Sequence, residues 1–267
     1  MDIKLPLSRR DIIANRLAGG QAVSASQLSV EFNISEDAIR RDLRALAAEG
    51  KCRRVYGGAL PLRSLPEPMA VRIEAAPQRK RLLAEAAARM ILPNEFVFLD
   101  SGSTNLAIVD LVPANLKITI ATNSIDIAAA VLRRGNAPLI LVGGMVNPHV
   151  GGSVDANAMA CVNDMNIDRC FLGACSVSAT TGVSVEDYSD AMFKKALAKR
   201  SSQLVVLSLS EKFQELAPHI VCGASDVDCL IVEGNLSADR EHELSSGGFA
   251  TLRAERDPAD TPAVDEP

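Results

Sequence analysis

From residue 79 onward, short apolar runs alternate with helix-like segments, and this pattern restricts the fold more than any other feature of the sequence. The runs are continuous, and they fall at residues 96–100, 118–121, 139–142, 170–172, 204–207 and 229–232. Continuous apolar strands separated by helices are typical of a parallel sheet that is covered on both faces. The pattern therefore predicts an α/β domain with a mostly parallel sheet over residues 78–246.

The stretches on either side of this domain differ from it in composition. Four prolines fall within residues 60–77 and predict a linker there, with a short helical piece at residues 69–75, because proline interrupts regular helix. Residues 247–267 are rich in proline and acid and show no apolar period, so we expect a disordered tail. The chain of 267 residues then has room for a second, small domain at residues 1–59.

Charge is unevenly distributed between these parts. Residues 1–63 hold 11 basic and 7 acidic side chains, a net charge of +4, whereas the rest holds 17 basic and 26 acidic ones, a net charge of −9. The whole chain has a net charge of −5, which by itself does not indicate a nucleic-acid partner. A basic block on an acidic body favours contact of the small domain with a polyanion, and an ordinary solvated surface with a chance imbalance is the alternative.

The third predicted helix of the N-terminal block has one apolar face and one basic face. Ser35 caps it, and Ile39, Leu43 and Leu46 share the buried face by helical spacing. Arginines project from the opposite face, and a basic hairpin follows Gly50. This arrangement fits a helix-turn-helix domain whose third helix enters the major groove and whose hairpin forms a wing against the DNA backbone. A small helical bundle with a solvated basic face is the alternative.

The block from about residue 8 to residue 59 closely resembles the helix-turn-helix signature of DeoR-family transcriptional regulators. The resemblance is carried by SEDAIRRDL at residues 35–43, by Glu49-Gly50 and by RVYGGA at residues 54–59. One difference is Ala38, where the family usually has threonine. The resemblance implies a winged helix-turn-helix domain over residues 1–59 that binds double-stranded operator DNA. The DNA-binding residues that it implies are Ser35, Asp37, Arg40, Arg41, Arg44, Lys51, Arg53 and Arg54.

Turns suited to anions follow three successive strands of the predicted sheet. They are DSGSTN at residues 100–105, TNS at residues 122–124 and the pair Gly143-Gly144. Backbone N–H groups at a helix start, flanked by glycine and hydroxyls, bind phosphate, and ligands gather outside the carboxyl ends of parallel strands. Asp100 is expected to hold the turn or a ligand hydroxyl, because two anions repel. Each turn alone is also consistent with a purely structural helix cap.

These turns, in the same order, resemble the effector domain of the DeoR family, which is similar in fold to ribose-5-phosphate isomerase and CoA-transferase-type proteins. Further matching segments are Asp168, FLGA at residues 171–174, Gly182 and residues 186–195. Leu209 differs from the family, which commonly has aspartate there. The resemblance implies a sugar-phosphate-sensing domain with Lys212 near the ligand phosphate. The effector-binding residues are then Asp100, Ser101, Gly102, Ser103, Thr104, Asn105, Thr122, Asn123, Ser124, Gly143, Gly144 and Lys212.

Cysteine and histidine give no sign of a metal centre or of a cofactor. The six cysteines lack C-x-x-C spacing, and the three histidines, His149, His219 and His242, lie far apart. Aromatic residues make up only 3% of the chain, which argues against recognition of stacked bases. The sequence shows neither a signal peptide nor a run of about 18 apolar residues. We therefore expect a cytoplasmic chain with reduced thiols and no membrane contact.

These patterns predict a DNA-binding transcriptional regulator. We expect it to repress a carbohydrate or related metabolic operon, and we expect a phosphorylated sugar to release the repressor from DNA. We expect a homo-oligomer, a dimer or a tetramer, because one helix-turn-helix module has limited area and affinity. A sugar-phosphate isomerase is the alternative from another class, with Glu186, Asp187 or Glu211 as its base, and a CoA transferase is a third. No acidic motif surrounds these carboxylates, so we predict no enzymatic activity and no catalytic residue.

Overall fold

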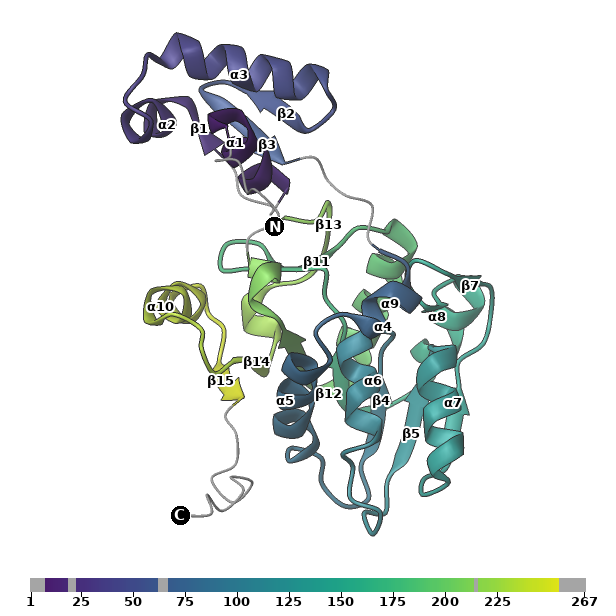
Figure 1. Ribbon diagram of the computed structural model, residues 1–267. Coiled ribbons are helices and arrows are strands. Elements are labelled where there is room, and N and C mark those ends of the chain that lie inside the picture. Colours follow the sequence, from purple (N-terminus) through teal and green to yellow (C-terminus); the bar gives the residue numbers. More distant parts are fainter. Residues whose placement is uncertain (1–7, 19–22, 62–66, 214–215, 255–267) are drawn as a thin grey trace, which may run out of the picture. The chain divides into compact units, whose positions relative to one another are not determined.

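The computed structural model describes residues 8–18, 23–61, 67–213 and 216–254 of the chain (Figure 1). It divides the chain into two compact units, unit 1 (Met1–Leu65) and unit 2 (Pro66–Pro267). Each unit has an apolar core of its own.

The described residues of unit 1 form three helices and a small antiparallel sheet. The helices are α1 (Arg9–Ala18), α2 (Ala25–Glu31) and α3 (Glu36–Ala48). The strands are β1 (Val23–Ser24), β2 (Cys52–Val55) and β3 (Gly58–Pro61), in the order β1-β3-β2. Because β2 and β3 form a hairpin directly after α3, this part of the unit is a winged helix-turn-helix (Figure 1).

The apolar spacing of α3 explains how unit 1 packs. The buried face of this helix consists of Ile39, Leu43 and Leu46. These side chains join one core with apolar residues of α1 and α2. The hydroxyl of Ser35 accepts a hydrogen bond of 3.3 Å from the N–H of Ala38, which confirms the predicted cap and fixes where α3 begins.

Unit 2 contains the predicted parallel sheet. Its seven strands stand in the order β15-β14-β12-β9-β4-β5-β6, and every neighbouring pair is parallel. The strands are β4 (Phe96–Leu99), β5 (Thr119–Thr122), β6 (Leu139–Leu141), β9 (Ile167–Leu172), β12 (Ser201–Ser208), β14 (Cys229–Glu233) and β15 (Thr251–Ala254). All except β15 coincide with the apolar runs of the sequence, so the predicted α/β class is confirmed.

Helices cover both faces of this sheet (Figure 1). One layer holds α5 (Pro77–Ala88), α6 (Ser103–Val109) and α7 (Ile125–Arg134), and the other holds α8 (Ala156–Asn163) and α9 (Tyr188–Arg200). Val97 and Leu99 pack under the first layer, whereas Phe98 between them packs under the second. Coverage of both faces explains why these strands are continuously apolar. No helix within the described ranges is long and apolar enough to cross a membrane.

The order of the sheet reverses at β4. The chain continues from β4 to β5 and β6 on one side, whereas β9, β12 and β14 follow on the other side. At such a switch point the loops after two neighbouring strands diverge, and ligands bind outside the carboxyl ends of the strands. The loops that follow β4 and β9 are therefore the expected place for a ligand in unit 2.

Several short elements complete unit 2. They are α4 (Met69–Glu74), the antiparallel ribbon β7 (Val146–Asn147) and β8 (Gly152–Ser153), the strands β10 (Ser176–Ser178), β11 (Gly182–Val185) and β13 (His219–Cys222), and the 3-10 helices η1 (Ser210–Phe213) and η2 (Ala224–Asp226). The helix α4 lies within the stretch expected to be a linker. Strands of two to four residues give too short a pattern to be predicted from apolar spacing.

The predicted disordered tail is wrong for its first residues. After α10 (Ala238–Ser246), the chain forms β15, which pairs in parallel with β14 and buries Phe249 and Ala254. The apolar run was missed because this edge strand of four residues contributes only one large apolar side chain. The α/β domain therefore extends past residue 246 to residue 254, and residues 255–267 lie outside the described part of the chain.

Candidate functional site

The exposed face of α3 carries the arginines that the sequence analysis assigned to DNA. Arg40, Arg41 and Arg44 are all exposed, on the side of the helix away from its buried stripe. Arg40 forms an ion pair of 2.7 Å with Glu36 one turn earlier, and the Nε of Arg44 donates to the carbonyl oxygen of Arg40 at 3.3 Å. Exposed pairs of this kind are weak, so the arginines are available to an anionic partner.

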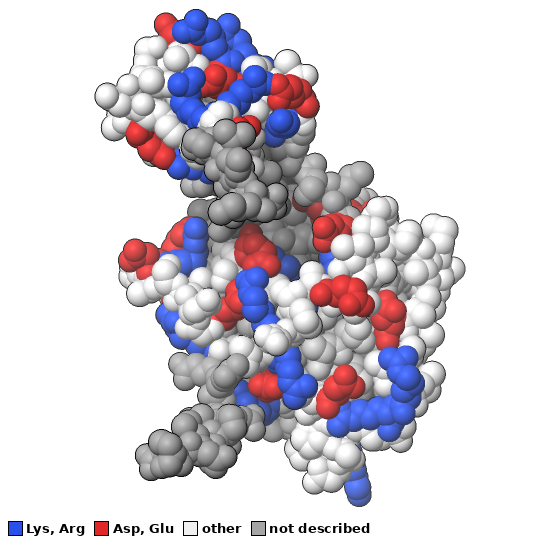
Figure 2. All heavy atoms as spheres, in the orientation of Figure 1, with Lys and Arg blue, Asp and Glu red and all other residues white. Residues whose placement is uncertain are grey.

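Ion pairs with arginines of α1 occupy several acidic side chains of unit 1. Asp42 of α3 accepts from the Nε of Arg9 at 2.8 Å, and Glu49 is paired with Arg10. Glu31 of α2 is likewise paired with Arg16. Each pair holds a carboxylate beside a basic side chain, which reduces the repulsion that these acids would exert on a polyanion. On the face shown in Figure 2, basic side chains gather over unit 1 with acidic ones between them.

The hairpin after α3 presents a second basic surface. Arg53 and Arg54 are exposed on β2, whereas Lys51 lies 3.1 Å from Glu49. Tyr56 is fully exposed at the tip of the hairpin, followed by Gly57 with a φ of +81°. The sequence analysis did not assign Tyr56, although an aromatic residue directly before the glycines of a hairpin turn was a usable signal in a chain with two tyrosines.

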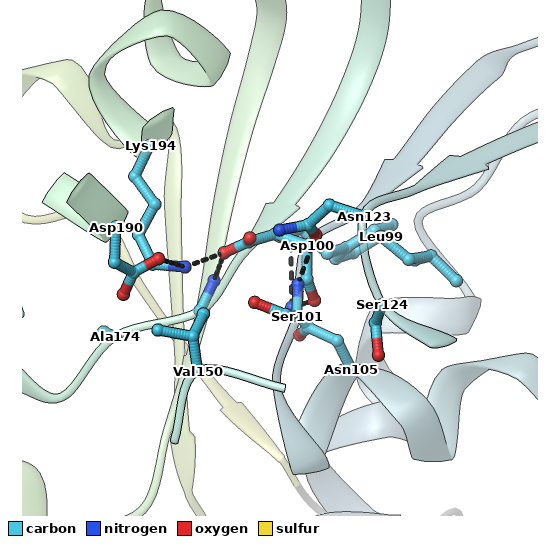
Figure 3. A network of polar contacts seen from close by, with 12 residues as sticks. Leu99, Asp100, Ser101, Asn105, Asn123, Ser124, Val150, Ala174, Asp190 and Lys194 are labelled. Carbon is cyan, nitrogen blue, oxygen red and sulfur yellow. Dashed lines mark hydrogen bonds and ion pairs between the residues drawn. The ribbon is translucent and has the colours of Figure 1, made fainter. Parts of the chain in front are cut away.

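In unit 2, Asp100 stands at the switch point between β4 and β9. Its Oδ2 accepts a hydrogen bond of 2.7 Å from the N–H of Gly173, the residue after β9, and pairs with the ammonium group of Lys194 (Figure 3). Lys194 also lies 3.0 Å from Asp190 one turn earlier on α9. The second oxygen of Asp100, Oδ1, is buried and has no hydrogen-bond partner among the described residues.

Burial and mutual charge together determine how this buried triad ionises. Burial by itself would lower the pKa of Lys194, but the carboxylates of Asp100 and Asp190 raise it above its usual value, so the lysine is charged. Burial raises the pKa of Asp190 against the opposing effect of Lys194. The sequence analysis missed Lys194 and Asp190. Their signal was two charged residues at i,i+4 spacing among the buried positions of α9.

In the predicted phosphate turn at residues 101–105, some polar groups form hydrogen bonds that hold the turn (bracing groups), and others have no partner in the described part of the chain (open groups). The N–H of Ser101 donates to Asn123 at 2.9 Å, and the amide of Asn105 donates to the carbonyl oxygens of Asp100 and Phe171 at 3.0 and 2.8 Å. These groups hold the turn. By contrast, the hydroxyl of Ser101 is buried without a partner, and α6 begins after Gly102, which has no side chain to cap it. The first backbone N–H groups of α6 therefore receive no side-chain cap from Gly102.

The second predicted turn serves to brace the loops. Thr122 donates to the carbonyl oxygen of Leu99 at 2.6 Å, and Asn123 donates to the carbonyl oxygen of Ser153 at 3.2 Å. Ser124 caps α7 by accepting from the backbone. All three side chains, Thr122, Asn123 and Ser124, are completely or almost completely buried. Their hydrogen bonds connect the ends of β4, β5 and β8.

The third predicted turn, Gly143-Gly144, is next to an acid. A Cβ on Gly144 would overlap the carboxylate of Asp155, which accepts from the N–H of Met145 at 2.9 Å. A different glycine approaches the Ser101 turn: a Cβ on Gly152 would lie only 2.9 Å from the Cβ of Ser101. Gly152 was missed from the sequence because it begins β8, a strand of two residues with no apolar pattern of its own.

Lys212 belongs to a group of three basic side chains. Its ammonium group donates to the carbonyl oxygen of Ala174 at 2.6 Å. Burial lowers the pKa of Lys212 to about 8, and the charges of Arg72 and Lys80 act in the same direction. Lys80 is buried, and its ammonium group donates to the carbonyl oxygen of Arg72. Among the described residues, neither lysine has an ion pair with a carboxylate.

Arg72 connects this basic group to the glycine loop. Its guanidinium donates to the carbonyl oxygens of His149 and Val150 at 2.7 and 3.1 Å, directly before Gly151-Gly152. The sequence analysis missed Arg72 and Lys80. The signal for Lys80 was a lysine in line with the buried Leu83, Ala84 and Ala87 of α5.

The basic group and Asp100 lie on two sides of one turn. Gly173 donates to Asp100, and the next residue, Ala174, accepts from Lys212. One side offers cations and the uncapped start of α6, and the other offers the free Oδ1 of Asp100 and the hydroxyl of Ser101. The first side suits a phosphate and the second suits hydroxyl groups. Together they suit a small molecule that carries both.

The carboxylates considered for an isomerase have other partners. Asp187 caps α9 by accepting from the N–H of Asp190 at 2.8 Å. Glu211 pairs with Arg79 at 2.7 Å, and Arg79 also binds Glu233. Within the described residues, the side chain of Glu186 forms no hydrogen bond or ion pair. Within those residues, no group of histidine, cysteine or acidic side chains could hold a metal ion.

Comparison with known families matches both units of the chain. The model of the DeoR-like helix-turn-helix domain matches residues 9–64. The model of the DeoR C terminal sensor domain matches residues 75–234, which is more than half of the chain. The first match spans α1 to the hairpin, and the second spans Asp100, Lys80 and Lys212.

Full-length relatives agree with these matches. The chain is 29% identical to the uncharacterized HTH-type transcriptional regulator YgbI of Escherichia coli K12, over 95% of this chain and 100% of the relative. It is 29% identical to the HTH-type transcriptional regulator IolR of Bacillus subtilis, over 72% and 76%. It is 26% identical to the glycerol-3-phosphate regulon repressor of E. coli K12, over 79% and 84%.

Among solved structures, ribose 5 phosphate isomerase A from Neisseria gonorrhoeae is similar to part of the chain. The sequence identity is 17%, the TM-score is 0.39, and the match covers 52% of this chain and 54% of the isomerase.

Proposed function

We propose that this chain represses a carbohydrate-related operon. It belongs to the DeoR family of helix-turn-helix transcriptional regulators and is not an enzyme. In this proposal a phosphorylated sugar metabolite binds unit 2 and releases the repressor from its operator. The relative that is named a glycerol-3-phosphate regulon repressor supports both repression and a phosphorylated effector. Two chains or four assemble on DNA, because one recognition helix covers only one half-site.

Unit 1 provides the DNA-binding surface of the repressor. The arginines of α3 contact base edges and phosphates in the major groove, and the basic hairpin contacts the neighbouring backbone. Ser35 and Asp37 lie at the start of α3, where the N-terminus of the helix points to the DNA backbone in this docking geometry. Tyr56, at the tip of the hairpin, adds a contact to the sugar-phosphate backbone.

The observation that carries the effector proposal is the group of three basic side chains beside the open start of α6. A buried lysine, Lys80, and a half-buried one, Lys212, that form no ion pair among the described residues are unfavourable unless an anion compensates them. A phosphate between Lys80, Lys212 and the N–H groups of Ser103 and Thr104 provides this compensation. Because Lys212 loses its proton only near pH 8, it is mostly charged at neutral pH.

The orientation of the effector follows from the opposite end of the pocket. Asp100 is negatively charged and buried, so a phosphate near it is repelled. Its free Oδ1 accepts a hydrogen bond, and the hydroxyl of Ser101 donates or accepts one. We therefore place the hydroxyl-bearing carbon chain of the effector at Asp100 and Ser101, and the phosphate at the lysines.

Calorimetry with purified chain tests this pocket. Glycerol 3-phosphate, pentose phosphates and hexose phosphates are titrated into wild type, Lys212→Ala and Gly102→Asp, and propyl phosphate serves as the ligand without hydroxyls. The substitution at Gly102 places a carboxylate at the start of α6, so both variants should lose binding of the phosphate that wild type prefers. Exposed Lys199→Ala is the control and should bind as wild type does. Equal binding by wild type and both variants contradicts the pocket.

A further inference from the structure

One edge of the parallel sheet in unit 2 is apolar and uncharged. The edge strand β6 pairs only with β5 among the described strands. Residues 135–154 include no Asp, Glu, Lys or Arg. Six large apolar side chains are exposed on β6 and on its neighbours α7 and β7, and we call this surface the β6 face. It consists of Ile125, Leu132, Ile140, Leu141, Met145 and Val146.

The exposure on the β6 face is large for apolar side chains. Leu132 of α7 is 70% exposed and Met145 is 78% exposed, while Ile140 and Leu141 are 41% and 51% exposed on adjacent strand positions. Along the side of unit 2 where β7 lies in Figure 1, Figure 2 shows a surface without charged side chains. Contiguous apolar surface of this kind marks a site of association.

The backbone of β6 has hydrogen-bonding groups to offer as well. The carbonyl oxygen of Pro138 and the N–H of Val142 are bonded to β5, at 3.0 and 2.8 Å. Backbone groups alternate between the two sides of a strand, so the N–H and C=O groups of Leu139 and Leu141 point to the open side. An open edge of this kind is a template for another strand.

The opposite edge of the same sheet is protected. Its edge strand, β15, carries Arg253, which pairs with Glu241 at 2.6 Å and donates to the carbonyl oxygen of Gly234 at 2.8 Å. Charged side chains on an edge strand prevent it from pairing with another chain. Because β6 lacks such protection and β15 has it, the two edges of the sheet have different surroundings in the assembled protein.

We infer that the β6 face joins two copies of this chain about a twofold axis. This inference rests on the homo-oligomer of the proposed function. The charge pattern of α7 selects a second copy as the partner. Asp126 lies in the first turn of this helix and Arg133 in the last turn, on the same side of its exposed stripe. When two copies of α7 pack antiparallel, Asp126 of each copy faces Arg133 of the other. The uncharged strand between them matches the apolar centre of a homodimer interface.

Sedimentation velocity of the full chain tests the strand part of this interface. Ile140→Lys places a charge on the open edge, and we expect self-association at least about a hundredfold weaker, so that the assembly loses half its mass. Leu252→Lys is the matched control, because Leu252 is 40% exposed on the opposite edge strand and Ile140 is 41% exposed. It should keep the wild-type mass. Wild-type mass for Ile140→Lys overturns the inference.

A charge swap tests the twofold pairing independently of the strand. Asp126→Arg places like charges opposite each other and should weaken self-association about tenfold, and Asp126→Arg with Arg133→Asp should restore it. The two positions are seven residues apart on one helix, too far for direct contact within a chain, so rescue requires a second copy. The absence of rescue, with circular dichroism showing both variants folded, overturns the antiparallel arrangement.

These outcomes separate the interface from the proposed function. If wild type assembles and the Ile140→Lys variant has the same mass, the β6 face alone is overturned. A wild type that stays monomeric, both free and on DNA selected by the full chain from random duplexes, overturns the β6 face together with the homo-oligomer of the proposed function. Halved mass for Ile140→Lys with an unchanged Leu252→Lys supports both.

Discussion

Lys194 is the residue on which the centre of unit 2 most depends. It is fully buried and lies between Asp100 and Asp190, which hold no other cation among the described residues. Lys194→Met leaves two carboxyl groups buried without their partner, so we expect a loss of about 3–5 kcal/mol in the free energy of unfolding. Urea denaturation measures this loss. Lys199→Met on the exposed side of α9 is the control, and an equal effect of the two substitutions would contradict the role of Lys194.

The ionisation of Lys212 makes two opposite predictions for pH. Its pKa in the folded chain is about 8, below the ordinary value of 10.5, so the folded state binds fewer protons than the unfolded state between these values. The contribution of Lys212 to the free energy of unfolding should therefore rise between about pH 8 and pH 10.5. Binding of a phosphate ester, which is already dianionic at pH 7, should weaken over the same interval as the lysine loses its charge.

Thermal melts and calorimetry across this interval test both directions. Lys212→Met removes the titrating group, so the fall in affinity should become flatter and the free energy of unfolding should rise less than in wild type. The contributions of Lys80, whose pKa burial lowers, and of Cys170 and Cys222, whose pKa burial raises, should remain. If the affinity of wild type for the ester rises with pH, a phosphate at Lys212 is contradicted.

At the scale of elements, α3 and the hairpin have separable roles on DNA. Arg41→Ala should weaken binding to the preferred sequence by about 1–3 kcal/mol and relax specificity at one base pair. Arg53→Ala on β2 should weaken binding to all sequences alike and reduce the slope of affinity against salt by about one unit. Fluorescence anisotropy with selected and scrambled duplexes measures both. Arg200→Ala, at an exposed position of unit 2, is the control. Unchanged DNA affinity of both unit 1 variants refutes the DNA-binding surface.

The last strand distinguishes the folded part of the C-terminal segment from the rest. A chain that ends at residue 254 retains β15, whereas a chain that ends at residue 246 loses it together with the buried Phe249. Loss of a buried phenylalanine costs about 3–5 kcal/mol, so the shorter chain should melt roughly 10 °C lower. The longer truncated chain should melt as the full chain does. Identical melting of both truncated chains would contradict the packing of β15.

Elements with a repeated pattern were predictable from the sequence, and isolated ones were not. The helix α3 and five of the six strands at residues 96–232 have strong apolar patterns because neighbours cover them, whereas the edge strand β6 is apolar although Ile140 and Leu141 are exposed. β15 was missed because an edge strand of four residues needs few apolar side chains. The turn at residues 100–105 was predicted from the sequence. Which of its polar groups form hydrogen bonds within the protein was not predictable, because this depends on contacts from β9 and α9. Arg72 and Lys80 approach the pocket from elements far away in sequence.

At the scale of the whole molecule, the proposed repressor couples a pocket in one unit to DNA binding by another. The effector releases DNA only if it binds more tightly to the form of the assembly that binds DNA poorly. The helix α4 is the described element of unit 2 that follows unit 1 most closely in sequence, and Arg72 on it holds the loop over the Ser101 turn. We propose that ligand contacts at this loop reach α4 through Arg72.

Release of DNA by a phosphorylated sugar is the most direct test of the central proposal. Wild type and Lys212→Ala are bound to a fluorescent duplex selected by wild type, and the ester that binds most tightly in calorimetry is titrated into each complex. We predict that the anisotropy of wild type falls to that of free DNA, and that Lys212→Ala binds the same duplex with wild-type affinity but stays bound at every ester concentration. Wild-type complexes that no sugar phosphate dissociates, or equal release of the variant, would contradict the proposed function.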